Sequence, residues 1–214
     1  MSNKYHVLLN ESTGEFEDKK SRFLARMVPV TSEEEAYMIL EQERKKYYDA
    51  KHHCSAFILT ADPGKPAVMR ASDDGEPQGT AGRPMLEVLQ GADLQGVVVV
   101  VTRYFGGTLL GTGGLIRAYT AAAQDALRNA KLGVMTYGAT FTLTTDYNSI
   151  GKIQYQLASR GLEPIASEYG AEVSMTLQVE EEEIDTIRAL LVEITNGQVK
   201  LSDNSFDYFV QVSC

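Results

Sequence analysis

Apolar and polar positions in the first part of the chain predict a strand, a helix and a hairpin in succession. Residues 22–30 (RFLARMVPV) have the pattern of a strand that ends at Pro29, and Thr31 or Ser32 is placed to cap a following helix. That helix carries glutamates at 33–35 and basic residues at 44–46, the polarity that the helix dipole favours. Residues 53–61 then predict a buried strand, followed by a turn at 62–64 and a shorter strand at 67–71.

The middle of the chain is rich in glycine. Residues 72–84 contain three glycines and two prolines and predict a loop, with a helix at 81–90. A continuous β-branched run at 97–103 is typical of a central strand. It is followed by a glycine-dense loop at 104–114 and an alanine-rich helix at 115–130 that ends near Gly133.

After Gly133 the pattern changes. It predicts a strand at 139–145, a helix at 147–160, strands at 162–168 and 172–179, a helix at 181–195 and a strand at 206–212. The order βαββαβ is that of the split-βαβ, ferredoxin-like arrangement, a four-stranded antiparallel sheet with two helices on one face. The sequence therefore predicts an α+β protein with two domains, residues 1–134 and 135–214.

Composition narrows the class of protein. With 214 residues and 43% hydrophobic content, the chain can form a substantial core. Its longest apolar run, Val97–Val101, is far shorter than the roughly 18 residues of a membrane span, and charged residues are spread through residues 1–22. Two cysteines, Cys54 and Cys214, form no disulfide framework and fit a reducing compartment. We therefore expect a cytoplasmic protein with no membrane partner.

The net charge of −9 is unevenly distributed. Residues 1–134 hold 16 basic against 17 acidic side chains, whereas residues 135–214 hold 4 against 12. The acidic excess belongs to the second domain, so the first domain remains free to carry the local positive patch that a nucleic acid requires.

The segment 103–119 (RYFGGTLLGTGGLIRAY) is the first candidate for chemistry. Five of the nine residues from Gly106 to Gly114 are glycine, and the start of the next helix offers unpaired N–H groups to an anion. The spacing matches neither a Walker A loop nor a dinucleotide fingerprint. The alternative is that the glycines serve tight turns and close packing. The predicted anion-binding residues are Arg70, Arg83, Arg103, Gly106, Gly107, Gly113, Gly114 and Arg117.

A second candidate is the carboxylate-rich segment at 73–84 (DDGEPQGTAGRP). Paired carboxylates can hold a metal ion or act as acid and base, but Asp-Gly is also an ordinary turn dipeptide. The neighbouring His52-His53-Cys54 lacks the further ligands of a zinc site and a base to activate the thiol, which favours a small buried cysteine. We predict no metal site, cofactor or catalytic residue, and a polar groove formed by His52, His53, Cys54, Asp73, Asp74, Glu76 and Thr80.

Three segments, 51–56 (KHHCSA), 72–82 (SDDGEPQGTAG) and 101–119 (VTRYFGGTLLGTGGLIRAY), together resemble the bacterial, YigZ-like IMPACT family. The resemblance implies an IMPACT N-terminal domain over about residues 16–130, related to the second domain of a small-subunit ribosomal protein. It further implies an acidic ferredoxin-like domain from about residue 138, similar to domains of elongation factor G. Eukaryotic members look like regulators of translational control, and bacterial members like nucleic-acid binders.

The resulting hypothesis is a translation-associated regulatory protein that binds nucleic acid or ribosome components through a groove rich in glycine and arginine. RNA, the ribosome and a protein partner in translation are the expected partners. One alternative is an enzyme that acts on a small phosphorylated or carboxylated substrate in the same groove, which requires the acidic, histidine and cysteine side chains to converge with the arginines. Another is an interaction adaptor, which requires a large exposed apolar patch.

Overall fold

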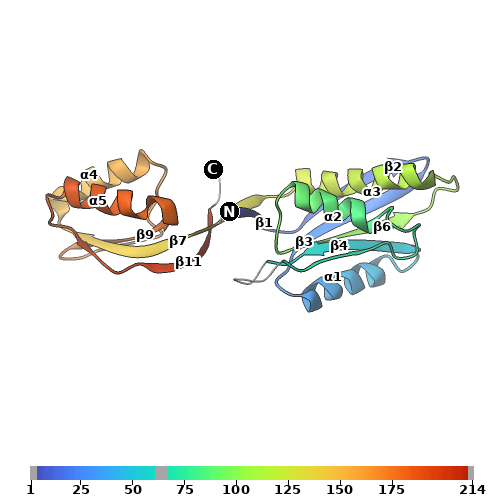
Figure 1. Cartoon of the computed structure of the whole chain (residues 1–214), viewed down its shortest axis with the longest axis horizontal. Coiled ribbons are helices and arrows are strands. Elements are labelled where there is room, and N and C mark those ends of the chain that lie inside the picture. Colours follow the sequence, from blue (N-terminus) through green and yellow to red (C-terminus); the bar gives the residue numbers. More distant parts are fainter. Residues whose placement is uncertain (1–3, 61–66, 212–214) are drawn as a thin grey trace. The chain divides into compact units, whose positions relative to one another are not determined.

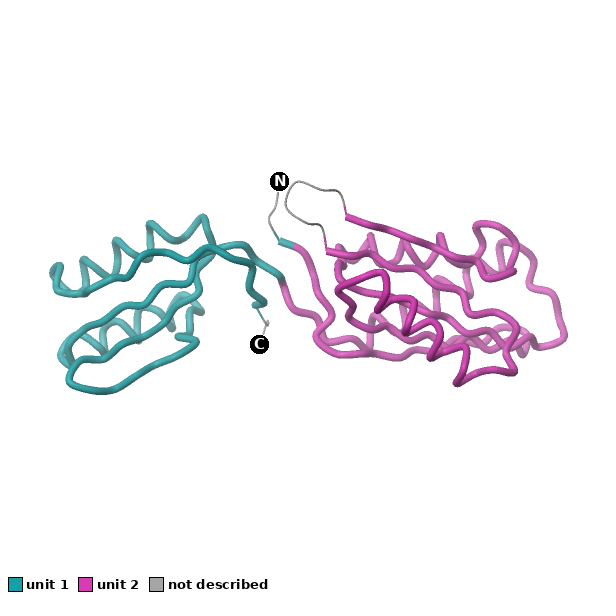
Figure 2. Tube along the Cα trace, turned by 90° about the horizontal axis from the view of Figure 1, so that it is seen from below, with its two compact units in different colours: residues 1–4, 135–211 teal, residues 5–134, 212–214 magenta. Residues whose placement is uncertain are grey.

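The computed structural model describes residues 4–60 and 67–211, which form two compact units (Figure 2). The larger unit runs from Tyr5 to Val134, and the smaller consists of Lys4 and residues 135–211. The predicted turn at 62–64 lies outside the described residues. No helix among the described residues is long and apolar enough to cross a bilayer.

The larger unit is a five-stranded antiparallel sheet with helices on both faces. The strand order is β2-β3-β6-β4-β5. Figure 1 shows two helices, α2 and α3, on one face of this sheet and α1 on the other. The bounds are β2 Ser12–Asp18, β3 Ser21–Pro29, α1 Glu33–Lys46, β4 His52–Ile58, β5 Met69–Ser72, α2 Gly82–Gly91, β6 Val97–Tyr104 and α3 Gly111–Arg128.

The valine run forms the centre of this sheet, as predicted. Strand β6 lies between β3 and β4, and its residues from Val97 to Thr102 are buried. Val97, Val99 and Val101 pack into the core beneath α2 and α3, while Val98 and Val100 pack into the core on the α1 side. A strand covered on both faces needs no polar alternation, which explains the continuous apolar run.

Helix α1 begins as the sequence predicts. The Ser32 side chain accepts a hydrogen bond from the Glu35 backbone N–H at 3.2 Å, and the Glu35 carboxylate accepts one from the Thr31 N–H at 2.6 Å. This reciprocal pair satisfies donors that the first turn leaves without a helical partner. The basic residues 44–46 lie in the last turn, as expected.

Two features of the larger unit differ from the prediction. Strand β2 was not expected, because Ser12–Asp18 has no apolar run. Helix α3 begins at Gly111 rather than at residue 115 and ends at Arg128. Glycine disfavours helix by about 1 kcal/mol per residue, so the local pattern indicated a loop there. Helix α3 as a whole packs along β2 and β3, but residues 111–113 of its first turn are exposed.

The smaller unit has the predicted order of strand, helix, two strands, helix and strand. Its strand β7 pairs with β9, and β9 pairs with β8, both antiparallel. Helices α4 and α5 cover one face of the sheet (Figure 1). The ferredoxin-like assignment and the similarity to elongation factor G domains stay predictions. The bounds are β7 Leu132–Thr145, α4 Tyr147–Ala158, β8 Ala166–Tyr169, β9 Val173–Glu180, a 3-10 turn Glu181–Glu183, α5 Ile184–Ile194, β10 Lys200–Leu201 and β11 Ser205–Gln211. Strand β1 Lys4–Leu8 lies mostly in the larger unit, and β1, β10 and β11 each pair with β7.

Candidate functional site

The first acidic residue of the loop before α2 caps that helix. One oxygen of Asp73 accepts the backbone N–H groups of Ala81 at 3.0 Å and Gly82 at 2.9 Å, and the other accepts that of Gly79 at 2.7 Å. These are the donors that would otherwise bind an anion at the helix start. The Asp73 carboxylate therefore serves as an internal anion, and the start of α2 is closed to a ligand.

This capping makes the stability of the larger unit depend on pH. Burial favours a higher pKa for Asp73, but the N–H groups of Gly79, Gly82 and Ala81 outweigh it and hold the pKa below its ordinary value. A lowered folded-state pKa contributes stability that is present above the unfolded pKa of about 3.9 and is lost as the pH falls through the folded value. We expect Asp73→Asn to lower the melting temperature at pH 7. The difference in melting temperature between this variant and the wild type should shrink below about pH 4, and thermal melts across pH 2–7 measure it. A difference that stays constant with pH would show that the Asp73 carboxylate is not its cause.

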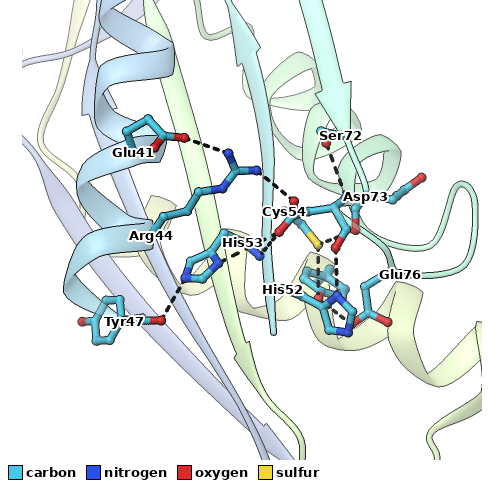
Figure 3. Close-up of polar contacts among 11 residues, drawn as sticks. Glu41, Arg44, Tyr47, His52, His53, Cys54, Ser72, Asp73 and Glu76 are labelled. Atoms are coloured by element: carbon cyan, nitrogen blue, oxygen red, sulfur yellow. Dashed lines mark hydrogen bonds and ion pairs between the residues drawn. The ribbon is translucent and has the colours of Figure 1, made fainter. Parts of the chain in front are cut away.

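The second acidic residue ties the loop to α1 and to β4. Asp74 has a positive φ of 42°. One of its oxygens accepts from the Arg44 guanidinium at 2.9 Å, and the other from the backbone N–H of His53 at 2.6 Å (Figure 3). The carbonyl oxygen of Asp74 lies 2.8 Å from Nδ1 of His52, and Nε2 of His53 lies 3.2 Å from the carbonyl oxygen of Tyr47. Both histidines are thus engaged with backbone groups.

The third acidic residue lies in a buried polar cluster that consists of Cys54, Glu76, Arg103 and Tyr119. One Glu76 oxygen accepts from the Arg103 guanidinium at 2.6 Å and from the Tyr119 hydroxyl at 2.7 Å. The Cys54 sulfur lies 3.3 Å from that hydroxyl and 3.0 Å from the carbonyl oxygen of Asp73. The cluster joins β4, β6, α3 and the acidic loop through side chains that are almost entirely buried.

This arrangement favours a structural role for the acidic loop over a catalytic one. Burial raises the pKa of the Cys54 thiol far above its usual value, and the carboxylates of Glu76, Asp74 and Asp73 add to the effect, so the thiol is no nucleophile at neutral pH. Burial likewise raises the pKa of Tyr119. Among the described residues, no group of three or more His, Cys, Asp or Glu side chains has the geometry of a metal site. The polar groups converge, but each contacts another protein group rather than an open pocket.

A second region, the basic end of the larger unit, consists of Lys19, Lys20, Arg117 and the start of α3. Lys19 and Lys20 form the β2–β3 turn, with φ of 46° and 66°, and both are exposed. The turn is held against the glycine loop, because a Cβ atom on Gly106 would lie 2.1 Å from the carbonyl carbon of Lys20. No side chain of the described residues caps α3, which begins after Leu110. In contrast to α2, this helix start leaves its first N–H groups open.

Arg117, the third cation of the basic end, lies at the end of the larger unit that holds the lysine turn. Gly14 of β2 packs directly against Ala126 of α3, and the two elements run in opposite directions. The strand advances about 13 Å over the four steps from Gly14 to Asp18, just before the lysine turn. The helix covers about the same distance over the nine steps from Ala126 back to Arg117. Arg117 is exposed on this part of α3. The lysine turn and Arg117 are therefore at the same end of the larger unit.

Comparison with known proteins supports the sequence motifs. A family model described as the Impact N-terminal domain matches residues 19–127, and one described as a domain of unknown function, DUF1949, matches residues 143–198. IMPACT family member YvyE of Bacillus subtilis is 33% identical over 208 residues, which is 97% of this chain and 94% of that protein. The chain belongs to the IMPACT family.

Two further comparisons cover most of the chain. IMPACT family member YigZ of Escherichia coli is 36% identical over 185 residues, which is 86% of this chain and 90% of that protein. A crystal structure described as that of a hypothetical protein is 32% identical, with a TM-score of 0.59, and covers 94% of this chain and 97% of the other. Both matches extend across the two units.

The structure places the four predicted anion-binding arginines in different surroundings. Arg70 of β5 is exposed and lies 3.5 Å from the carboxylate of Glu33. Arg83 of α2 is also exposed and lies 3.1 Å from the carboxylate of Glu87. Arg103 is buried against Glu76 and faces the protein interior. Of the four predicted arginines, Arg117 is the one whose guanidinium stays without a carboxylate among the described residues.

The predicted glycines have three different roles. Gly106 allows the close approach to the lysine turn, and Gly107 has a φ of 86° that favours glycine. Gly113 and Gly114 lie within the first turn of α3. Thr80, predicted to line a groove, is buried, and its hydroxyl donates to the carbonyl oxygen of Pro77 at 2.7 Å. Close packing and turns thus account for Gly106 and Gly107.

Sequence reasoning did not identify the partners of the acidic loop. The sequence places Arg44 only among the basic residues at the end of a helix, and Tyr119 only within the glycine-rich segment 103–119. Their contacts with Asp74 and Glu76 span 30 and 43 residues of sequence. No local pattern encodes contacts over such separations, so only the tertiary structure reveals them.

Proposed function

We propose that this IMPACT-family chain is a cytoplasmic, translation-associated regulatory protein that binds RNA through the basic end of its larger unit. Family membership supports the link to translation, because resemblance to this family implies translational control. The acidic smaller unit repels phosphate, which favours the larger unit as the binding part.

One observation carries the proposal. The structure describes eight arginines in the larger unit, and Arg117 alone has no carboxylate oxygen within 4 Å among the described residues. Lys19 and Lys20 likewise form no ion pair there. The ion-paired arginines are Arg22, Arg26, Arg44, Arg70, Arg83, Arg103 and Arg128. A cation that is not neutralised within the protein retains its charge for a phosphate.

The open start of α3 adds to this charge. The first N–H groups of a helix point outward and carry the positive end of its dipole, which stabilises a bound phosphate. At the start of α2 the Asp73 carboxylate fills the equivalent place. We therefore revise the sequence-based site to Lys19, Lys20, Arg117 and the α3 start, and assign Arg103 to the buried polar cluster.

Salt-dependent binding of fluorescent RNA tests this proposal. We expect the triple variant Lys19→Gln, Lys20→Gln, Arg117→Gln to bind much more weakly than the wild type. Its slope of log affinity against log salt should fall by about 0.7 for each phosphate that the variant no longer binds.

The matched control removes three ion-paired arginines instead, as Arg70→Gln, Arg83→Gln, Arg128→Gln. The two triples have the same net charge, and we expect the control to keep most of its affinity and its salt slope. Equal losses of affinity in both variants would show that the loss comes from the change in overall charge and not from a specific site. Absence of RNA binding at low salt in the wild type would refute the proposal.

A further inference from the structure

Phe105 presents half of its surface to solvent at the end of β6. It is 53% exposed. The Arg103 guanidinium lies over its ring, with Cζ 5.6 Å from the ring centroid. Since Glu76 holds that guanidinium at 2.6 Å, one face of the Phe105 ring rests on a group that the protein fixes in place. The rest of the ring is available to a ligand.

The backbone next to this ring is fixed against the lysine turn. The N–H of Gly106 donates to the Ser21 hydroxyl at 3.1 Å, directly after Lys20. A Cβ at Gly106 would approach the backbone of Lys20 and Ser21 to within 2.4 Å, so the two segments pack with no side chain between them. The backbone segments that carry Phe105 and the two lysines are therefore held in direct contact. An aromatic ring beside cations is the combination that binds the base and the phosphate of one nucleotide.

The two neighbouring aromatic residues are occupied. Tyr119 is buried and donates its hydroxyl to Glu76. Tyr104 donates its hydroxyl to Asp49 at 2.7 Å, and its ring lies edge-on to that of Tyr47 at 6.4 Å. Phe105 is the ring of these three that a base can reach.

We infer that the ligand of the basic end is single-stranded RNA, with one unpaired base stacked on Phe105 and adjacent phosphates on Lys19, Lys20 and the α3 start. This inference rests on the proposed function. Bases within a duplex are already stacked on their neighbours, whereas an unpaired base exposes a face to an aromatic side chain. Stacking also tolerates any base, so this contact requires no sequence preference.

The test compares two ligands that differ only in their bases. One is a fluorescent single-stranded oligonucleotide, and the other has the same length and backbone but abasic positions. We expect the wild type to bind the first ligand about 5- to 150-fold more tightly, the range that stacking one base provides. Phe105→Leu should abolish this preference while its affinity for the abasic ligand stays unchanged. The wild type and the Phe105→Leu variant should bind a duplex of the same length with equal affinity.

The Phe105→Trp variant reports the contact directly. The natural chain contains no tryptophan, so this side chain is the single indole, and its fluorescence should be quenched by the oligonucleotide with bases and unaffected by the abasic one. Leu109→Ala is the control for a general apolar contact, because Leu109 is 82% exposed in the same loop. It should leave the affinity for both ligands unchanged.

The outcomes separate the stacking inference from the proposed function. If both ligands bind equally and bind more weakly to the Lys19, Lys20, Arg117 variant, stacking is refuted and phosphate binding stands. If neither ligand binds, both ideas fail. A blue shift of the indole emission of the Phe105→Trp variant with acidic lipid vesicles, and no quenching with RNA, would overturn the inference in favour of a membrane surface.

Discussion

Glu76→Ala is expected to lower the free energy of unfolding of the larger unit by about 3–5 kcal/mol. The substitution leaves the Arg103 guanidinium buried without its counter-ion and removes the acceptor for the Tyr119 hydroxyl. One nitrogen of Arg103, Nε, is already buried without a partner among the described residues. A buried charge without its partner costs more than the pair contributes when intact, because desolvation is no longer compensated. Denaturant unfolding followed by circular dichroism measures the loss of stability.

The control for this prediction removes both charges. Glu76→Leu together with Arg103→Met should recover most of the stability, since an apolar pair of similar volume has no desolvation cost. Tyr119→Phe should cost only about 1–2 kcal/mol, because it removes the hydroxyl's hydrogen bond to Glu76 and its contact with the Cys54 thiol but keeps the ion pair. If Glu76→Ala proved no more harmful than Tyr119→Phe, the ion pair would not be the contact that holds the acidic loop.

Two glycines of the segment 106–114 are expected to respond in opposite directions to substitution by alanine. Gly106→Ala should destabilise the larger unit by about 1–3 kcal/mol or more, because the new Cβ would lie 2.1–2.4 Å from backbone atoms of Lys20 and Ser21. Gly113→Ala should stabilise it by up to about 1 kcal/mol. This residue lies in the first turn of α3, and a Cβ there meets only the Arg117 guanidinium, at 3.7 Å.

Thermal melts of the two variants beside the wild type test this pair. Gly113→Ala is the matched control, since both substitutions add one methyl group to the same glycine-rich segment. A stabilising Gly106→Ala variant would show that the loop and the lysine turn separate easily. The proximity of Phe105 to the lysine turn would then lose its basis.

The starts of α2 and α3 show how similar local sequence features can have opposite roles. Both α2 and α3 begin in glycine-containing segments, and both resemble anion sites in the sequence. The Asp73 carboxylate satisfies the first N–H groups of α2 from within the chain, whereas no side chain of the described residues caps α3. A helix start is open to a ligand only where the fold brings no internal carboxylate to it.

Local order along the chain could be predicted because local interactions determine it. Strand β6 can be predicted from the composition of its valine run alone, and helix α1 can be predicted from the cap and charge pattern of residues 31–46. The βαββαβ order of the second half follows from periodicity in the same way. Strand β2 and the first turn of α3 were missed because their own residues disfavour these structures. Pairing with β3 and packing against α3 offset that preference in β2.

The sequence by itself determined the family motifs, the excess of acid in the second half and the order of most helices and strands. Only the tertiary structure decided which charges are available to a ligand. Arg103 and Arg117 look alike in the sequence, yet one is neutralised by Glu76, 27 residues away, and the other stays without an acidic partner among the described residues. The physical reason is that an ion pair requires atoms within about 4 Å, and the fold rather than the neighbouring residues brings such atoms together.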